Sequence, residues 1–224
     1  STTATNQAIN PKIPYNVATD FTPIVNIAAT PNIIAANPKF AGKDYKSFLA
    51  EVKNNPGKYS YASPGQGSIT HLMMEMFKLE TKTDMTHVPY RGSGPALNDA
   101  VAGQVPLIFD NFPSTLPFVK EKRLTAIVVA APQRLAVLPD VPTFKEMGLP
   151  QVNRMAYYGI VGPKNLPKEV VDKVNAAVRK AVQDPAVKKR IEESGSIIMA
   201  DTPEAFAKQM AEELAVYKNV VQKQ

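Results

Sequence analysis

Cysteine and tryptophan are absent from this chain, and histidine occurs only twice, as His71 and His87. Without cysteine there is no disulfide bond, no thiolate nucleophile and no cysteine-ligated zinc site. Two histidines that are separated along the chain also argue against a metal cluster, so we expect no metal and no cofactor. A chain without cysteine suits the periplasm and the cytosol equally well.

Long hydrophobic runs are absent too. No apolar stretch approaches the roughly 18–20 residues that a membrane helix needs, so we expect no membrane insertion. No signal peptide is recognisable at Ser1, which says little about location because a mature chain would have lost it. The 224 residues, 44% hydrophobic and 21% charged, suffice for one large or two small globular domains.

The charge balance is mildly basic, with 26 lysines and arginines against 20 acidic residues and a formal net charge of +6. Nucleic-acid binding would need basic residues clustered on one face with aromatic residues between them. Here the lysines are scattered over several amphipathic segments, so we predict no nucleic-acid partner. A mild positive bias would instead help to attract anionic ligands.

The most informative stretch is a strand, a glycine loop and a helix in succession. Tyr59–Ser63 alternate and are β-prone, and Pro64, Gly65 and Gly67 then break the strand. Ser68 is a suitable N-cap for the helix that follows. The apolar face of that helix comprises Ile69, Leu72, Met73, Met76 and Phe77. Unpaired N–H groups and the positive end of the helix dipole at such a loop favour an anion.

The same design is repeated a little further along the chain. Residues 86–90 form a short predicted strand, Arg91–Gly94 form a second glycine loop, and Pro95 suits the first position of a helix over residues 96–102. Two helix N-termini could then face one crevice. In open α/β sheets the crevice at the carboxyl ends of the strands is where ligands bind.

Strands and helices alternate through the middle of the chain. After the glycine loops come an apolar strand over residues 104–110, which ends on Asp110, and a buried-type strand over residues 124–130. This alternation predicts an α/β fold with a mainly parallel sheet and helices on both faces. Three amphipathic helices follow, over residues 167–182, 185–193 and 203–221. They need a further sheet that the chain does not obviously supply, and the polar start over residues 1–10 is interpreted as a loop.

Nucleophilic catalysis is poorly supported by the sequence. A nucleophile elbow needs glycine two residues before and after the serine, but Ser68 has Gln66 and Thr70 there. His71 and His87 are interpreted as packing or hydrogen-bonding residues. The glycine loops also lack a complete dinucleotide fingerprint and a Walker-A lysine. We therefore predict no catalytic residue and no enzyme activity.

Two charged side chains leave alternatives open. Arg91 could clamp a ligand carboxylate through two hydrogen bonds, or it is a surface arginine paired with a local acid. Asp110 could orient a ligand amino group or hydroxyl or anchor a water, or it simply caps the loop that follows. The sequence does not decide between these roles.

Several motifs, taken jointly, are specific to one family. In chain order they are SPGQGSITHL over residues 63–72, HVPYRGSGPAL over 87–97, AGQV over 102–105, FD over 109–110 and LPDVPT over 138–143. Together they resemble the tripartite tricarboxylate transporter receptors, the TctC-like or Bug solute-binding proteins. The resemblance covers essentially the whole chain, in the order of the family.

The resemblance implies a type II periplasmic-binding-protein fold, in which two lobes, each with a mainly parallel sheet flanked by helices, close on a small ligand. It implies a periplasmic receptor whose signal peptide is not in this chain. Such a receptor captures a dicarboxylate, a tricarboxylate, an acidic amino acid or an aromatic acid and delivers it to a tripartite tricarboxylate-type membrane permease. Family members hold the carboxylate with backbone N–H groups and water, without catalysis or metal.

The resemblance also implies a division of the chain. Residues 26–149 would form lobe two, and residues 1–25 with 150–224 would form lobe one, which is expected to lack the N-terminal segment with which family members begin. The predicted ligand-binding residues are Ser63, Gly65, Gly67, Ser68, Arg91, Gly92, Ser93, Gly94 and Asp110, together with Thr5 and Asn6 from a lobe-one loop. Two other functions stay open, an enzyme acting on an anionic substrate at the helix N-termini and a ligand-sensing domain for a signalling partner.

Overall fold

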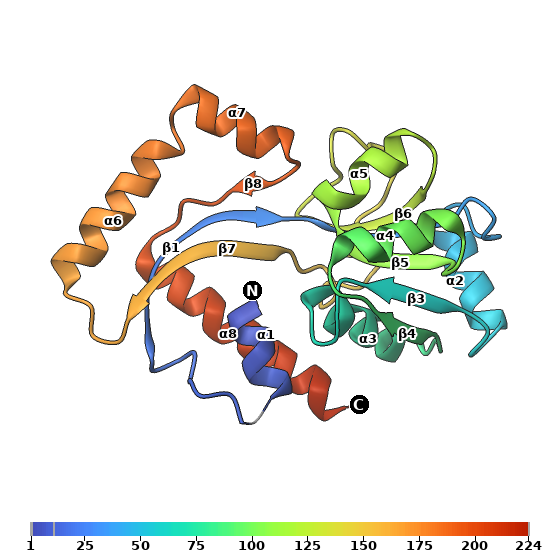
Figure 1. The fold of residues 1–224 in the computed structure, drawn as a ribbon, viewed down its shortest axis with the longest axis horizontal. Coiled ribbons are helices and arrows are strands. Elements are labelled where there is room, and N and C mark those ends of the chain that lie inside the picture. Colours follow the sequence, from blue (N-terminus) through green and yellow to red (C-terminus); the bar gives the residue numbers. More distant parts are fainter. Residues whose placement is uncertain (1, 11, 224) are drawn as a thin grey trace. The chain divides into compact units, whose positions relative to one another are not determined.

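The computed structural model describes residues 2–10 and 12–223, drawn in Figure 1. The chain divides into two compact units. Residues 31–155 form one unit, called here the continuous unit, and residues 1–30 with 156–224 form the other, called the terminal unit. The division falls after residue 30 and before residue 156, whereas the resemblance placed it at residues 25 and 150. The chain crosses between the units at the ends of two strands that pair with each other inside the terminal unit.

The continuous unit contains five strands and four helices among its elements. They are β2 (Asn32–Ala36), α2 (Tyr45–Asn54), β3 (Ser60–Ser63), α3 (Ile69–Thr81), β4 (Thr86–Pro89), α4 (Ser93–Ala102), β5 (Leu107–Asn111), α5 (Phe112–Lys120) and β6 (Thr125–Ala130). The strands form one sheet in the order β4-β3-β5-β2-β6. β3 is parallel to β4 and β5, whereas β2 is antiparallel to β5 and β6. Four strands thus share a direction, which confirms the mainly parallel sheet here.

Helices cover both faces of this sheet because the strands are apolar on both sides. The α4 helix packs its alanines and Leu97 against Ile108 of β5 and Ala62 of β3. The opposite face carries an aromatic cluster, in which Phe77 of α3 lies 5.9 Å from Phe48 of α2 between ring centroids. A strand buried on both faces must sit inside a sheet covered on both sides, which is typical of α/β proteins.

The terminal unit is built from two long strands and the helices that pack on them. Its elements are α1 (Thr2–Ile9), β1 (Phe21–Thr30), β7 (Ala156–Pro163), α6 (Lys168–Ala181), α7 (Pro185–Glu193), β8 (Ile197–Ile198) and α8 (Pro203–Gln222). β1 pairs with β7 and with the short β8, and both pairings are antiparallel. The expectation of a mainly parallel sheet is therefore wrong for this unit. Its two long strands are joined to each other through the whole continuous unit rather than by a crossover helix.

The polar start of the chain is a helix and not the loop that the sequence analysis expected. α1 packs along α8, and the Tyr15 hydroxyl donates to the Thr3 carbonyl at 3.0 Å. The segment is rich in threonine and asparagine, which are poor helix formers, so local propensity gave no signal. Tertiary packing against α8 overrides that propensity.

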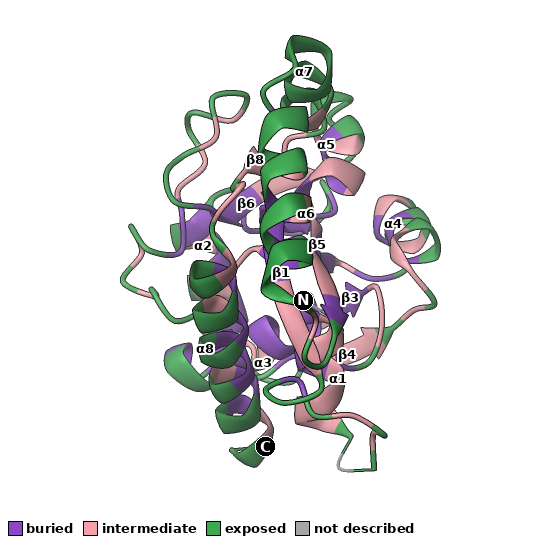
Figure 2. Ribbon diagram, turned by 90° about the vertical axis from the view of Figure 1, so that its left-hand side faces the viewer, coloured by how far each residue is buried: buried purple, intermediate pink, exposed green. Residues whose placement is uncertain are grey.

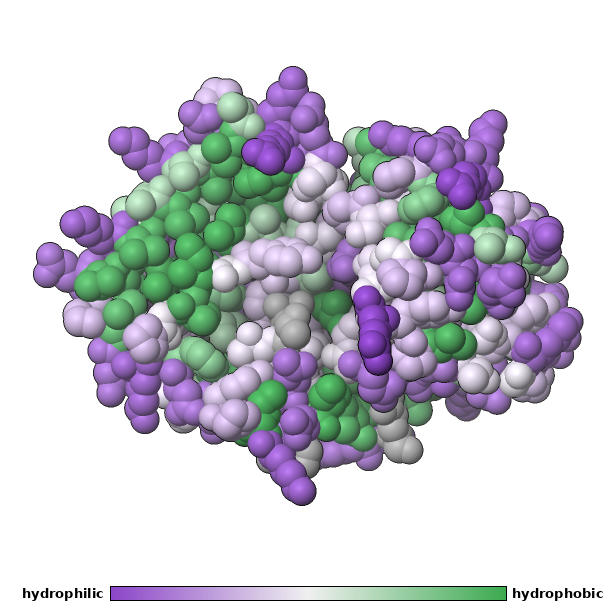
Figure 3. Space-filling model, in the orientation of Figure 1, coloured by the Kyte–Doolittle hydropathy of each residue, from purple (hydrophilic) through white to green (hydrophobic). Residues whose placement is uncertain are grey.

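The α6 helix presents an apolar stripe that is only partly covered. Val171 is buried with Ile24 and Val25 of β1, but Val174 and Val178 are only partly buried. Figure 2 shows that α6 and α7 are largely exposed. Figure 3 shows hydrophobic side chains gathered in a continuous patch over α6 and the adjoining strands of the same unit.

Gly159 on β7 is a position where only glycine fits. A Cβ built there would lie 2.5 Å from Cζ of Phe206 and 2.6 Å from the carbonyl oxygen of Val25. Phe206 is fully buried and also packs against Tyr157, with ring centroids 5.8 Å apart. The α8 helix therefore approaches the backbone of β7 through the space that glycine leaves free.

We expect Gly159→Ala to destabilise the protein by about 1–3 kcal/mol, because neither the Val25 backbone nor the packed Phe206 ring can move aside cheaply. Urea unfolding measures this. Gly162→Ala on the same strand is the matched control, since the one close neighbour of its Cβ would be the end of the flexible Leu166 side chain, at 2.6 Å. Equal stability losses in the two variants would contradict the explanation.

Candidate ligand-binding site

Two glycine loops leave the sheet of the continuous unit side by side. They follow β3 and β4, which are parallel neighbours, so both loops start at the same edge of the sheet. Two backbone hydrogen bonds join them beyond the strand ends. The Tyr90 N–H donates to the Ser63 carbonyl at 3.1 Å, and the Gly92 N–H donates to the Pro64 carbonyl at 2.7 Å.

The first loop satisfies its own backbone donors. The Gly65 N–H donates to Ser63 Oγ at 3.2 Å, the Gly67 N–H to His71 Nδ1 at 3.1 Å, and the Ser68 N–H to the Gly65 carbonyl at 3.1 Å. The prediction that these three N–H groups are free for an anion is therefore wrong in this structure. The same prediction for the N–H group of Gly92 in the second loop is also wrong, because this group donates to the first loop.

The α3 helix starts directly after this loop. Ser68 is its N-cap, as predicted, and its Oγ accepts from the His71 N–H at 3.2 Å. Gly67 has a φ of +72°, in the left-handed region that favours glycine. Among the hydrogen bonds of the described residues, none uses the N–H groups of Ile69 and Thr70 in the first turn. Those two donors remain at the positive end of the helix.

The two histidines of the chain lie against each other beneath the first loop. Their rings stack with centroids 4.0 Å apart and an interplanar angle of 18°. Tyr61 stacks on His87 with centroids 4.9 Å apart. Burial lowers the pKa of both imidazoles, and the pKa of His87 falls to about 4. Both histidines are therefore neutral near pH 7, in line with their interpretation as hydrogen-bonding residues.

Ser63 and His87 form a pair that resembles a nucleophile and its base. Ser63 Oγ lies 2.7 Å from His87 Nε2 and 3.2 Å from the Gly65 carbonyl oxygen. The Ser63 side chain is fully buried, however, and it accepts from the Gly65 N–H. A hydroxyl held in this way shapes the loop and is not presented to a substrate.

The start of α4 keeps its donors free. The N-cap Gly92 has no side chain to cap the helix, and Pro95 has no N–H to offer. The N–H groups of Ser93 and Gly94 have no partner among the hydrogen bonds found in residues 2–10 and 12–223. Gly94 is exposed, and apart from its chain neighbours and the backbone of its own helix no atom lies within 4 Å of where its Cβ would be. This helix N-terminus is therefore open to an anion.

Asp110 is the penultimate residue of β5 and lies beside the start of α4. Its Oδ1 accepts from Ser93 Oγ at 2.8 Å and from the Asn111 N–H at 2.6 Å. Its Oδ2 is buried without a partner, and the whole residue is 0% exposed. Burial raises the pKa of Asp110 to about 6, against the opposing effect of these two hydrogen bonds. The surroundings of Asp110 are thus compatible with both roles that the sequence left open, an acid at the site and a cap for the loop that follows.

Two asparagines at the same edge, the buried Asn32 and the half-buried Asn111, were not predicted from the sequence. Asn32 and Asn111 pair across β2 and β5, and the side-chain oxygen of each is buried without a hydrogen-bond partner. The Asn32 amide nitrogen donates to the Arg154 carbonyl at 2.9 Å. Buried acceptors without donors are uncommon and call for an explanation such as a water or a ligand donor. In the sequence, the only sign of these residues is a side-chain amide at the end of a predicted strand, and that sign alone does not predict a binding site.

The remaining predicted residues are Arg91 in the continuous unit and Thr5 and Asn6 in the terminal unit. Arg91 is exposed, and no ion pair of its side chain is found within the described part of the chain. Thr5 and Asn6 belong to the terminal unit, where they lie on α1 and not on a loop. Thr5 is buried and Asn6 is half-buried. The cluster therefore consists of Ser93, Gly94 and Asp110 with the first loop as its support.

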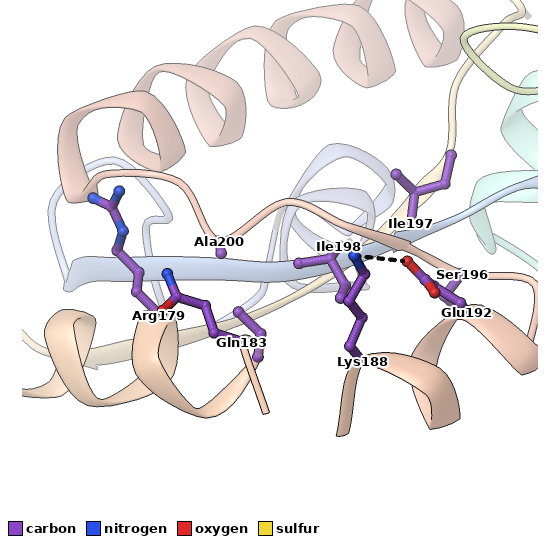
Figure 4. A pocket seen from close by; sticks show the side chains of 9 residues that line it. Arg179, Gln183, Lys188, Glu192, Ser196, Ile197, Ile198 and Ala200 are labelled. Atoms are coloured by element: carbon purple, nitrogen blue, oxygen red, sulfur yellow. Dashed lines mark ion pairs between the residues drawn. The ribbon is translucent and has the colours of Figure 1, made fainter. Parts of the chain in front are cut away.

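The terminal unit contains a separate cavity of about 640 Å³ that none of the predicted residues lines. It lies between the end of α6, α7 and β8, and Figure 4 shows its side chains. Ile197 and Ile198 supply apolar surface, whereas Lys188 is paired with Glu192 at 3.8 Å. No cluster of His, Asp or Glu side chains that could hold a metal occurs among the described residues.

Comparison with known proteins identifies the family. The profile of the tripartite tricarboxylate transporter family receptor matches residues 1–224. This chain belongs to that receptor family. A UPF0065 protein from the tcbD-tcbE intergenic region of Pseudomonas sp. is 34% identical over 198 residues, which are 88% of this chain and 59% of that protein. Protein BugT of Bordetella pertussis is 28% identical over 97% of this chain and 67% of its own length.

Solved structures of the receptor family share the fold. A structure described as a periplasmic transporter is 47% identical, with a TM-score of 0.90, and the match covers 100% of this chain and 75% of that one. MatC from Rhodopseudomonas palustris with bound malate is 32% identical, with a TM-score of 0.84, over 97% of this chain and 75% of MatC. An R. palustris protein with adipate is 27% identical, with a TM-score of 0.88, and the match covers 99% of this chain and 74% of that one. These neighbours confirm the periplasmic-binding-protein fold class.

The chain spans about three fifths to two thirds of the length of the first curated relatives of the receptor family. Members of this family are solute-binding receptors, and the solved structures that this chain resembles are of periplasmic proteins. Within the described residues no helix is both long enough and apolar enough to span a bilayer.

We expect Asp110→Asn to stabilise the protein at neutral pH. An Asn side chain still accepts from Ser93 and Asn111 but removes a buried charge whose pKa is raised to about 6. A raised folded-state pKa means that the carboxyl favours folding at pH below about 4 and that this benefit is lost as pH rises through about 6. The gain at pH 7.5 should therefore reach at most about 2–3 kcal/mol and fade towards pH 4.5.

Thermal unfolding of both proteins between pH 4.5 and pH 7.5 measures this difference. Asp140→Asn, at an exposed carboxyl, is the control and should show no such trend. A difference between Asp110→Asn and the parent that stays constant with pH would show that the buried carboxyl does not carry the effect.

Proposed function

We propose that this chain is a periplasmic solute-binding receptor that captures a small carboxylate and delivers it to a tripartite tricarboxylate-type permease. The observation that carries the proposal is the start of α4, where the Ser93 and Gly94 N–H groups are unpaired and the helix dipole is positive. The family and the malate- and adipate-bound neighbours support the same ligand class.

The proposed ligand places one carboxylate on the Ser93 and Gly94 N–H groups. A small anion can approach these donors because Gly94 has no side chain and lies in open space. Asp110 is too close to tolerate a second negative charge beside it, so its unpaired Oδ2 would face a hydroxyl, an amino group or a bridging water. Adipate and malate, the ligands of two neighbours, are both dicarboxylates, and a dicarboxylate is the ligand we favour.

In this proposal the first loop supports the site instead of donating to the ligand. Its N–H groups hold its own shape, and the bond from Gly92 to Pro64 fixes the second loop relative to it. Arg91, exposed beside the loop, is proposed to attract the anion before it binds. No residue is assigned a catalytic role, because Ser63, which contacts His87, is fully buried and its hydroxyl holds the shape of the first loop.

Thermal unfolding in the presence of single carboxylates tests the ligand class. The panel contains malate, adipate, citrate, aspartate, glutamate and benzoate, with glucose and lysine as unrelated solutes. A ligand at 100 times its dissociation constant should add about 2.7 kcal/mol of stability and raise the midpoint visibly. No shift with any carboxylate, for a chain shown to be folded, would contradict carboxylate capture.

Gly94→Val tests the position of the ligand. Because the site of its Cβ is open and exposed, we expect the stability of the free protein to change little. The branched side chain would obstruct the approach to the N–H groups, so affinity for the carboxylate found in the panel should fall about tenfold or more, equivalent to about 1.4 kcal/mol. Titration calorimetry measures this.

Asn98→Val, at an exposed position further along α4, is the matched control and should bind like the parent. Unchanged affinity in Gly94→Val would place the carboxylate elsewhere. Delivery to a permease is tested separately, by whether deletion of the gene abolishes uptake of the same carboxylate by cells.

A further inference from the structure

The two stacked histidines hold both ends of the first glycine loop. His71, on α3, accepts from the Gly67 N–H near the end of the loop, at 3.1 Å. His87, on β4, lies 2.7 Å from Ser63 Oγ at the start of the loop. The ring centroids are only 4.0 Å apart, so the loop is fixed from below by one compact pair of imidazoles.

The bond to Gly67 requires a particular protonation state of His71. An imidazole nitrogen accepts a hydrogen bond only when it carries no proton, so Nδ1 must be bare and the remaining ring proton must be on Nε2. Protonation at Nδ1 turns this acceptor into a donor that faces another donor, the Gly67 N–H. The hydrogen bond is then lost and the loop must move.

The surroundings of the pair oppose protonation. His71 is 5% exposed, and burial lowers the pKa of both rings. Stacking at 4.0 Å also means that a charge on one ring disfavours a charge on the other. The charged and titratable groups that face the pair are Tyr61 of β3 and Glu75 and Lys78 of α3. Glu75 accepts from the Tyr61 hydroxyl at 2.7 Å and pairs with Lys78 at 3.0 Å. Burial has the largest effect on the pKa of His71 and lowers it, whereas the charge of Glu75 raises this pKa and the charge of Lys78 lowers it.

Movement of the first loop would reach the ligand site directly. The Gly92 N–H donates to the Pro64 carbonyl at 2.7 Å, and Gly92 is the N-cap of α4. A Cβ on Gly65 would lie 3.2 Å from the Tyr90 carbonyl oxygen, so the two loops are also in close contact. The free donors of Ser93 and Gly94 are the next residues along the chain.

We propose that His71 is a positioning residue whose neutral ring holds the glycine loops in the ligand-binding shape, so that its protonation weakens ligand binding. The expected effect on affinity rests on the proposed function, the binding of a carboxylate at the start of α4. It makes the receptor sensitive to acid through a residue that does not contact the ligand. His87 contributes by stacking on His71 and by holding Ser63.

The test compares the parent chain with His71→Asn and His71→Leu. The Oδ1 atom of asparagine can occupy the place of Nδ1 and accept from Gly67, but it does not titrate near neutral pH. Leucine provides no acceptor at any pH. Malate and adipate are the probes, titrated by calorimetry between pH 7.5 and pH 4.5, and protonation of the probe itself is the same for every variant.

For the parent, the dissociation constant should rise from pH 7.5 to pH 4.5 by about threefold or more beyond the rise seen in His71→Asn. His71→Leu should bind weakly at every pH, with no extra rise of its own. Superimposable pH profiles of the parent and His71→Asn would overturn the proposal, as would full affinity in His71→Leu.

A measurement without ligand separates this proposal from the proposed function. NMR of the chain labelled with ¹⁵N-histidine reports the protonation of each ring nitrogen, and amide hydrogen exchange reports the Gly67 N–H. We expect an unprotonated Nδ1 in His71 at pH 7.5 and faster exchange at Gly67, relative to His71→Asn, as the ring titrates. Titration of His71 with no change at Gly67 would refute the positioning role, even if neither malate nor adipate binds.

Discussion

The candidate site depends on the parallel pairing of β3 with both β4 and β5. Because the three strands point the same way, the loop after β3, the loop after β4 and the acid at the end of β5 emerge at one edge of the sheet. The pairing continues past the strand ends through the bond from Gly92 to Pro64. A shift of one residue in either register would turn the side chain of Asp110 away from Ser93 and separate the two loops. The contact between Ser93 and Asp110 and the bond between the two loops therefore both depend on the register of this sheet.

Much of this arrangement could be predicted from the sequence, because it is encoded locally. Ser68 as an N-cap, the glycines of each loop and the apolar strand that leads to Asp110 are signals that each occupy only a few consecutive residues. The use of the loop donors could not be predicted in the same way. The Gly67 N–H is bonded to His71, whose acceptor nitrogen is set by ring orientation, and Ser63 meets His87 only after β3 and β4 have paired. A glycine loop therefore predicts the place of a candidate site better than it predicts which N–H groups are free there.

The terminal unit shows the complementary limit of sequence reasoning. The helices α6, α7 and α8 were predicted from their amphipathic pattern, and in the structure the side chains of Asp184 and Thr202 cap α7 and α8. The antiparallel sheet and α1 were not predicted, because β1 and β7 are separated by the whole continuous unit and α1 is stabilised by α8. Periodicity reports which face of an element is buried and contains no information on the direction of a partner strand. Such pairings follow from topology, which is a property of the whole receptor fold.

The titration of Asp110 and the titration of the two histidines change the stability of the fold in opposite directions with pH. The raised pKa of Asp110 favours folding in acid, and this benefit is lost as pH rises through about 6. The lowered pKa values of the histidines favour folding above about 6.5, and that benefit is lost as pH falls towards about 4. Between about pH 4 and pH 6, the stability gained by protonating Asp110 offsets part of the stability lost by protonating the imidazoles. The contributions of these groups to the pH dependence of folding therefore partly cancel in mild acid, the range in which the bond between His71 and Gly67 is proposed to break.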